Sequence, residues 1–285
     1  MSALEYDPSQ TALYHPEAQP SAFASVPAQG DLSLAVEAAR LAYLRTEESD
    51  AARLTLKITL SSQGFGQPEY FRHGPTGSEG FGTLRDDGCA LIALRGTQID
   101  RIKDLISDVQ VMRMTWTPGH GQVHSGFAKA ALGLWPSIQT WLDDTAHQRT
   151  SLTITGHSLG AAIATLLAEP AGADLLVTLG SPRVGDPDFI QGLAAQKKLR
   201  VMRLVDCCDV VTELVPASLG FDHVHGLGYI DHNGVLQASF SHAQILEDQE
   251  KARVDYLMRY ARHPENVFLR DWADHAPINY VRAFW

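Results

Sequence analysis

Two patterns of apolar residues alternate along the chain. Short, nearly continuous apolar runs are typical of buried strands, whereas apolar residues that recur every three or four positions are typical of one face of a helix. The first pattern predicts strands over residues 89–95, 151–155, 174–180 and 199–206. The second predicts helices over residues 34–45, 52–60, 124–148, 158–169, 186–196, 242–263 and 271–284. Strands that alternate with helices form a largely parallel sheet with helices on both faces, so the sequence predicts an α/β fold.

Turn and helix-breaking residues refine this plan. Asp87-Gly88 and Asn233-Gly234 are each flanked by strand-like residues and predict two hairpins, because these dipeptides favour tight turns between antiparallel strands. Pro136 falls inside a long helical repeat. We expect the helix to end or kink there, since proline lacks the N–H that the helix needs.

The first 30 residues differ in composition from the rest. They are rich in Pro, Ala, Ser and Gln and predict an extended or poorly ordered N-terminal arm that wraps the domain. Residues 31–285 contain no internal repeat and no second stretch of distinct amino-acid composition. A single α/β domain of this size is common. The sequence therefore predicts residues 1–30 as an arm and residues 31–285 as one domain.

Composition and charge restrict the class of protein. Hydrophobic residues make up 45% of the chain and charged residues 20%, which is typical of soluble globular proteins. The formal net charge of −10 argues against nucleic-acid binding and against strong attraction to anionic lipid surfaces. The sequence shows no Sec signal peptide and no apolar run long enough to span a bilayer. A cytoplasmic location is the default expectation, with export by a signal-less route left open.

The cysteines do not indicate a disulfide framework or a zinc ribbon. Cys89, Cys207 and Cys208 are an odd number with one adjacent pair, and no CxxC motif occurs. Clustered His and Asp residues at metal-ligand spacing and the phosphate-loop pattern are also missing from the sequence. We therefore expect no metal and no cofactor.

Ser158 stands between two glycines where a predicted strand gives way to a helix, in the segment Gly156–Gly160. A serine hydroxyl is a weak nucleophile, which needs a base beside it and hydrogen-bond donors in front of it. A sharp strand-to-helix turn provides this placement, because it holds the serine side chain out at the carboxyl-terminal edge of the sheet, where substrate can reach it. Glycines on either side remove Cβ atoms that would crowd the turn. The alternative is an ordinary turn in which Ser158 caps the helix. We expect His157 to pack, because adjacent side chains on a tight turn point apart.

Five further blocks accompany this motif, and with it they resemble the class 3 lipases, fungal-lipase-like members of the α/β-hydrolase fold. The blocks are ALIALRGT (90–97), KDLISD (103–108), VHSGF (123–127), TLGSPRVGD (178–186) and VDCCDVVTELVP (205–216). Leu105 stands where tryptophan is common in the family, and Thr212 where proline is usual. Strong matches run from about residue 81 to 216, and the first 30 residues match nothing. The resemblance implies an α/β-hydrolase fold with a mostly parallel central sheet and helices on both faces.

Triad roles follow from the resemblance and from the order Ser, acid, His of α/β-hydrolases. The family match selects Asp209 as the acid, and Asp206 is the alternative, since both follow an apolar strand. His275 follows Asp274 near the C-terminus, as the catalytic histidine does in family members with an Asp-His pair there. His242, at the start of a long helix, is its main competitor, because geometry and not sequence decides membership of a triad.

The resemblance also assigns the oxyanion hole. The family places the two donors on the backbone N–H groups of the residue after the serine, here Leu159, and of the residue that closes the Arg-Gly-Thr turn, here Thr97. In many lipases a helical lid follows that turn. Residues 98–108 have one apolar face at near-helical spacing, which fits either a mobile lid or a helix packed permanently on the core.

These residues predict a serine carboxylic ester hydrolase that acts through an acyl-enzyme intermediate, and the resemblance implies a triacylglycerol lipase or esterase. Its partner would be a lipid or other ester substrate, with transient contact with a lipid interface left open. A phospholipase A1 or feruloyl-type esterase on the same fold is the first alternative. A catalytically inactive lipid- or partner-binding protein is the second, and the retained Ser, Asp and His candidates weigh against it. The sequence does not determine acyl chain length, head-group preference, oligomeric state or compartment.

Overall fold

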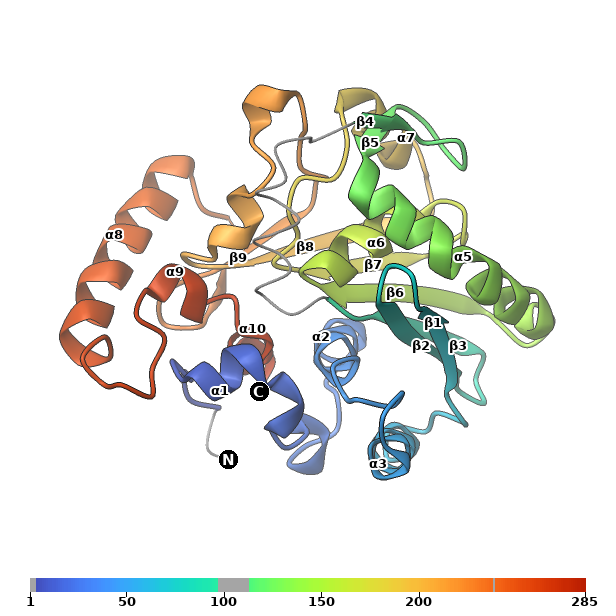
Figure 1. Cartoon of the computed structure of the whole chain (residues 1–285), viewed down its shortest axis with the longest axis horizontal. Helices are drawn as coiled ribbons and strands as arrows, with labels where there is room; N and C mark the ends of the chain where they lie inside the picture. The colour runs from blue at the N-terminus through green and yellow to red at the C-terminus, as the bar shows by residue number, and fades with distance from the viewer. Residues whose placement is uncertain (1–3, 97–112, 238) are drawn as a thin grey trace.

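The computed structural model describes residues 4–96, 113–237 and 239–285, and its centre is one eight-stranded sheet (Figure 1). The strand order is β1-β2-β3-β6-β7-β8-β9-β10, and β4 and β5 form a separate antiparallel pair. The strands are β1 Glu69–His73, β2 Ser78–Leu84, β3 Cys89–Leu94, β4 Arg113–Thr115, β5 Gln122–His124, β6 Ser151–His157, β7 Leu175–Leu179, β8 Arg200–Asp206, β9 Leu227–Ile230 and β10 Leu236–Gln237. Strands β3, β6, β7, β8 and β9 run parallel, so their carboxyl ends meet at one edge.

Helices cover both faces of this sheet (Figure 1). They are α1 Gln10–Tyr14, α2 Asp31–Leu41, α3 Asp50–Ser61, α5 Ser125–Thr145, α6 Leu159–Ala168, α7 Pro187–Ala194, α8 His242–Arg259, α9 Arg270–Ala273 and α10 Pro277–Val281. Helices α5 and α6 share one apolar cluster with Ile92 and Ile154, whereas α2 and α10 share another with Val177. Apolar residues point to both sides of the sheet, as the continuous apolar runs predict. Among the described residues, no helix is both long and apolar enough to cross a membrane.

The two predicted hairpins are present, but the prediction for Pro136 needs correction. Leu84 pairs with Ala90 across the first turn, and β9 pairs antiparallel with β10 across the second.

Helix α5 runs without interruption through Pro136, so the prediction that the helix could end there is wrong. Leu134 and Ile138, on either side of the proline, are fully buried in the core. Their burial outweighs the backbone bond that the proline removes.

The chain between residues 271 and 284 forms two short helices and not the single helix expected. Helix α9 ends at Ala273, and α10 begins at Pro277, which occupies its first turn. Proline has no N–H to donate, and it disfavours helical backbone in the residue before it. The break between the two helices carries His275.

The N-terminal segment is packed against the C-terminal helices, where the sequence predicts an extended or poorly ordered arm. The backbone N–H of Asp7 donates to Asn279 Oδ1, and Asn279 Nδ2 donates back to the Asp7 carbonyl, both at 2.9 Å. Ala12 and Leu13 of α1 are buried in the same apolar cluster as α10. Figure 1 shows α1 beside α10. Apolar residues scattered among the prolines hold this segment on the domain.

Candidate active site

A sharp turn between β6 and α6 carries Ser158. Its backbone has φ 60° and ψ −125°, which is a strained conformation for a residue other than glycine. A Cβ on Gly156 would lie 2.4 Å from the Gly160 carbonyl group, and one on Gly160 would lie 2.1 Å from the Leu94 carbonyl oxygen. Only glycines fit these two positions, so the sequence motif is a steric requirement of the turn.

Ser158 is the first member of a hydrogen-bonded chain of three side chains. Ser158 Oγ lies 2.9 Å from His275 Nε2. His275 Nδ1 lies 2.8 Å from Asp209 Oδ2 and 3.0 Å from Asp209 Oδ1. With the Nδ1 proton donated to the carboxylate, Nε2 is free to accept the serine proton, as a general base must. The structure thus brings together the three residues that the sequence singled out, although 117 positions separate the serine from the histidine.

Asp209 receives two further hydrogen bonds. It follows β8 and caps a short 3-10 turn, where its Oδ1 accepts the Val211 N–H at 2.8 Å. Its Oδ2 accepts the hydroxyl of Tyr280, on α10, at 2.5 Å. Asp209, His275 and Tyr280 are at most 2% exposed. The sequence does not single out Tyr280, since its partner lies 71 positions away and nothing in its local pattern distinguishes it from a core aromatic residue.

His157 packs beside the triad, as expected from its place on the turn. Its ring lies 4.3 Å from the ring of His275, centroid to centroid, and its Nδ1 lies 2.7 Å from the hydroxyl of Tyr43. Burial holds the pKa of His157 well below its ordinary value, with a smaller contribution from His275. A neutral His157 can therefore contact the imidazole of His275 without competing for its proton.

The two alternatives for the triad lie elsewhere. Asp206 is fully buried at the end of β8, and neither of its carboxylate oxygens has a hydrogen-bond partner among the described residues. Burial and the nearby Asp274 raise its pKa well above the ordinary value. His242 begins α8 and is exposed. Neither side chain takes part in the hydrogen-bonded chain that includes Ser158.

Access to the serine differs from expectation. The sequence predicts a hydroxyl held out for substrate, whereas Ser158 has no exposed surface in the structure, so that prediction is wrong for this conformation. Leu159, one of the two predicted oxyanion donors, is the first residue of α6 and follows the serine directly. Thr97, the other predicted donor, and the predicted lid residues 98–108 lie outside the described residues.

A charged cluster adjoins the end of β3, just before the predicted oxyanion turn. Arg95 pairs with Glu47 at 2.8 Å and with Glu79 at 2.9 Å. Burial raises the pKa of Glu79 to about 7, with Glu47 adding to the rise and Arg95 opposing it. Arg95 thus ties β3 to two other segments of the chain, in line with a role in holding the loop.

These features define a Ser-His-Asp arrangement on a parallel α/β sheet with a glycine-flanked elbow, the arrangement of a serine hydrolase site. Residues 91–219 match the family model described as lipase (class 3). Together with the relatives and structures below, this match supports the class 3 lipase family for this part of the chain, and the structures show the α/β-hydrolase fold.

Several curated proteins are similar over part of their length. The lipase of Rhizopus niveus is 32% identical over 160 residues, which cover 49% of this chain and 38% of that protein. Phospholipase A1-II 1 of Oryza sativa subsp. indica is 43% identical over 85 residues, 26% of this chain and 21% of that protein. The chain therefore spans about a fifth to two fifths of the length of these relatives.

Solved structures resemble the fold over most of the chain. The native Rhizomucor miehei lipase propeptide complex has a TM-score of 0.58 at 21% identity, over 80% of this chain and 82% of that one. A triacylglycerol lipase described as having a serine protease triad at its catalytic centre has a TM-score of 0.56 at 20% identity, over 86% and 89% of the two chains. At such identities the likeness establishes the fold alone.

Proposed function

We propose that the protein is a serine carboxylic ester hydrolase with Ser158 as nucleophile, His275 as general base and acid, and Asp209 as the carboxylate that orients the imidazole. The observation that carries this proposal is the continuous chain of hydrogen bonds from Ser158 Oγ through the ring of His275 to Asp209. The strained turn at Ser158 supports it, because such strain persists where function requires it.

Ester cleavage then proceeds in two half-reactions. Ser158 Oγ attacks the ester carbonyl carbon while His275 Nε2 takes the hydroxyl proton, and the carbonyl oxygen becomes an oxyanion. We assign its stabilisation to the backbone N–H groups of Leu159 and Thr97, each worth about 3 kcal/mol of barrier. Collapse releases the alcohol, which takes the proton from His275. A water molecule then attacks the acyl-enzyme by the same steps, with His275 taking its proton, and the carboxylic acid is released from Ser158.

We propose lipid esters as the substrate class, with triacylglycerols first. The lipase relatives support this choice, and the phospholipase A1 relatives support phospholipids as the second candidate. Triolein, phosphatidylcholine and p-nitrophenyl esters of graded acyl length separate the two. Faster turnover of triolein than of phosphatidylcholine supports the first, and the reverse order supports the second.

The buried hydroxyl of Ser158 implies that substrate entry requires an opening movement. We propose that contact with a lipid interface favours the open form. A fluorophosphonate probe should therefore label the protein faster in the presence of substrate-like micelles than in buffer. Equal labelling rates in both conditions would contradict the interfacial part of the proposal, and absence of labelling in both would favour the non-catalytic alternative.

Ser158→Ala tests the nucleophile. We expect it to lower ester turnover to the background rate and to abolish covalent labelling, with circular dichroism unchanged. Ser137→Ala is a matched control, because among the described residues that hydroxyl on α5 bonds to its own helix alone. Turnover by folded Ser158→Ala at more than about a hundredth of the wild-type rate would overturn the assignment, since loss of a triad nucleophile costs several orders of magnitude.

A further inference from the structure

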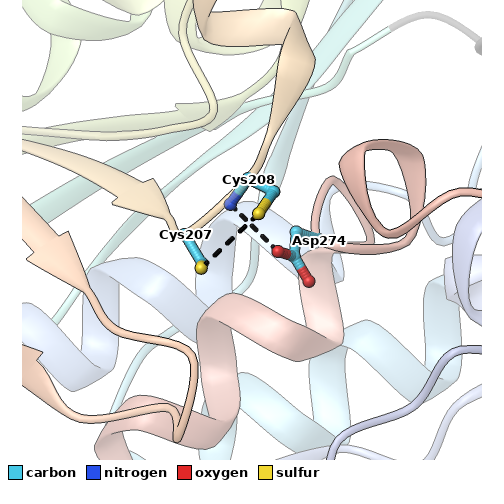
Figure 2. A group of neighbouring side chains, drawn as sticks. All are labelled: Cys207, Cys208 and Asp274. Carbon is cyan, nitrogen blue, oxygen red and sulfur yellow. Dashed lines mark hydrogen bonds between the residues drawn. The ribbon is translucent and has the colours of Figure 1, made fainter. Parts of the chain in front are cut away.

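Two adjacent cysteines and an aspartate form a buried cluster behind the turn that carries Asp209 (Figure 2). The sulfur atoms of Cys207 and Cys208 lie 3.7 Å apart. A carboxylate oxygen of Asp274 completes a set of three atoms that all lie within 4.8 Å of one another. All three residues are at most 3% exposed. The proposed hydrolysis uses none of these side chains.

The backbone holds the two thiols side by side. Cys207 has φ 35°, which is rare for a residue with a side chain, and its N–H donates to the Ile230 carbonyl at 2.9 Å. The Cys208 N–H donates to Asp274 Oδ2 at 3.0 Å, so the carboxylate is fixed to the same turn. Cα atoms of adjacent residues are about 3.8 Å apart, closer than an ordinary disulfide allows. The pair is therefore better suited to act as a dithiol than as a disulfide.

We propose that Cys207, Cys208 and Asp274 form a binding site for a thiophilic divalent metal ion of the zinc and cadmium class. Two thiolates bound to tetrahedral zinc at about 2.3 Å each lie about 3.8 Å apart. The observed sulfur separation of 3.7 Å meets this requirement without rearrangement of the thiols. The carboxylate oxygen lies within 4.8 Å of both sulfurs, so it needs to approach them by at most about 1 Å to complete the three ligands.

Charge balance favours such an ion in this buried place. Binding of M²⁺ by two thiols releases two protons to solvent, so the net charge of the cluster does not change. Asp274 keeps its outer partners, because Tyr6 donates to its Oδ1 at 2.8 Å and Arg270 donates to its Oδ2 at 3.0 Å. Hydrogen bonds of this kind orient ligating carboxylates in metal sites. Thiolate ligands also select zinc and cadmium over magnesium and calcium.

A cavity adjoins the cluster at Cys208. Cys208 lines a space of about 470 Å³ together with Asp209 and with Gln249 of α8. The side-chain amide of Gln249 donates to the Cys207 carbonyl at 2.7 Å, so this wall of the cavity is tied to the dithiol turn. An ion that enters here would link the end of β8 to the segment between α9 and α10. The structure thus supplies three candidate ligands, a suitable sulfur spacing and a cavity next to one of the thiols.

The test titrates the reduced, metal-free protein with cadmium and measures the near-ultraviolet absorption of cadmium–thiolate bonds. We expect the absorption to saturate at one ion per chain in the wild type and in Cys89→Ser. Cys89 is a matched control, because it begins β3 at the opposite end of the sheet from Asp209. We expect Cys207→Ser and Cys208→Ser to lose most of the absorption. Asp274→Asn should retain the absorption and weaken the affinity at least tenfold.

X-ray absorption of the zinc-loaded wild type provides a readout that needs neither a variant nor turnover. We expect two sulfur neighbours at about 2.3 Å and an oxygen neighbour at about 2.1 Å. Coordination by nitrogen and oxygen alone would overturn the proposal, because it would place the ion on histidines or carboxylates elsewhere. Cadmium–thiolate absorption that survives in Cys207→Ser and Cys208→Ser, or that disappears in Cys89→Ser, would overturn it as well.

Discussion

Asp209 and Asp206 provide a sharp test of the proposed triad, because both are buried and lie three residues apart. We expect Asp209→Asn to fold. An asparagine Oδ1 can still accept the N–H of Val211 and the Nδ1–H of His275, while its amide group takes the place of Oδ2, beside the hydroxyl oxygen of Tyr280 and His275 Nδ1. What the variant loses is the negative charge beside the imidazolium that forms as Ser158 attacks.

The size of this loss follows from Coulomb's law. A unit charge about 4 Å from the imidazolium contributes about 4 kcal/mol at an effective dielectric constant of about 20. The charge on His275 develops only in the transition state, so the loss appears in kcat. At about 1.4 kcal/mol per factor of ten, Asp209→Asn should lower kcat about a thousandfold. The Nδ1 to Oδ2 distance of 2.8 Å places the two groups in direct contact, so little screening by solvent is expected.

The assay measures kcat and KM on a p-nitrophenyl ester, with circular dichroism and thermal unfolding as checks of the fold. Asp206→Asn is the control. Asp206 makes no hydrogen bond to the triad, so its variant should keep kcat within about threefold of the wild type. A thousandfold loss in Asp206→Asn with near-normal turnover in Asp209→Asn would refute the assignment of the acid. Similar small effects in both would refute the charge argument itself.

Three further predictions concern the surroundings of the site. Tyr280→Phe removes a donor to the buried Asp209 carboxylate and should lower the free energy of unfolding by about 1.5–3 kcal/mol in urea titrations; no change would mean that the bond contributes nothing to stability. Because the pKa of Glu79 rises from 4.5 to about 7 on folding, the folded state retains a proton that the unfolded chain has released, and this group lowers stability as pH rises across that window. Glu79→Gln should flatten that decline in unfolding titrations at pH 5 and pH 8, and an unaltered pH dependence would contradict it. Gly160→Ala places a Cβ 2.1 Å from the Leu94 carbonyl oxygen and should destabilise the fold by about 3 kcal/mol or more in thermal unfolding; a wild-type melting temperature would show that the turn can relax.

Several features follow from the sequence because their causes are local. The alternation of apolar strands and helices gives the largely parallel sheet, since burial of these runs on both faces leaves few other arrangements. Both hairpins form where turn dipeptides interrupt strand-like residues. The glycines on either side of Ser158 predict the sharp strand-to-helix turn, because no other residue fits a turn this tight.

Other features depend on contacts between distant parts of the chain. The continuity of α5 through Pro136 follows from burial of its neighbours, which the local pattern does not contain. The N-terminal segment is held in part by the hydrogen bonds between Asp7 and Asn279, which are 272 positions apart. The same holds for Tyr280 and for the pairing of Cys207 and Cys208 with Asp274.

By itself the sequence determined the strand-to-helix turn at Ser158, the class of fold, and a short set of acids and bases near it. Only the tertiary structure decided which of them meet. It places His275 on the break before Pro277 within 2.9 Å of the serine, leaves Asp206 without a hydrogen bond and near Arg282, and buries the hydroxyl. The reason is that a local pattern fixes backbone conformation, whereas a hydrogen bond across 66 or 117 positions depends on how the strands are ordered in the sheet.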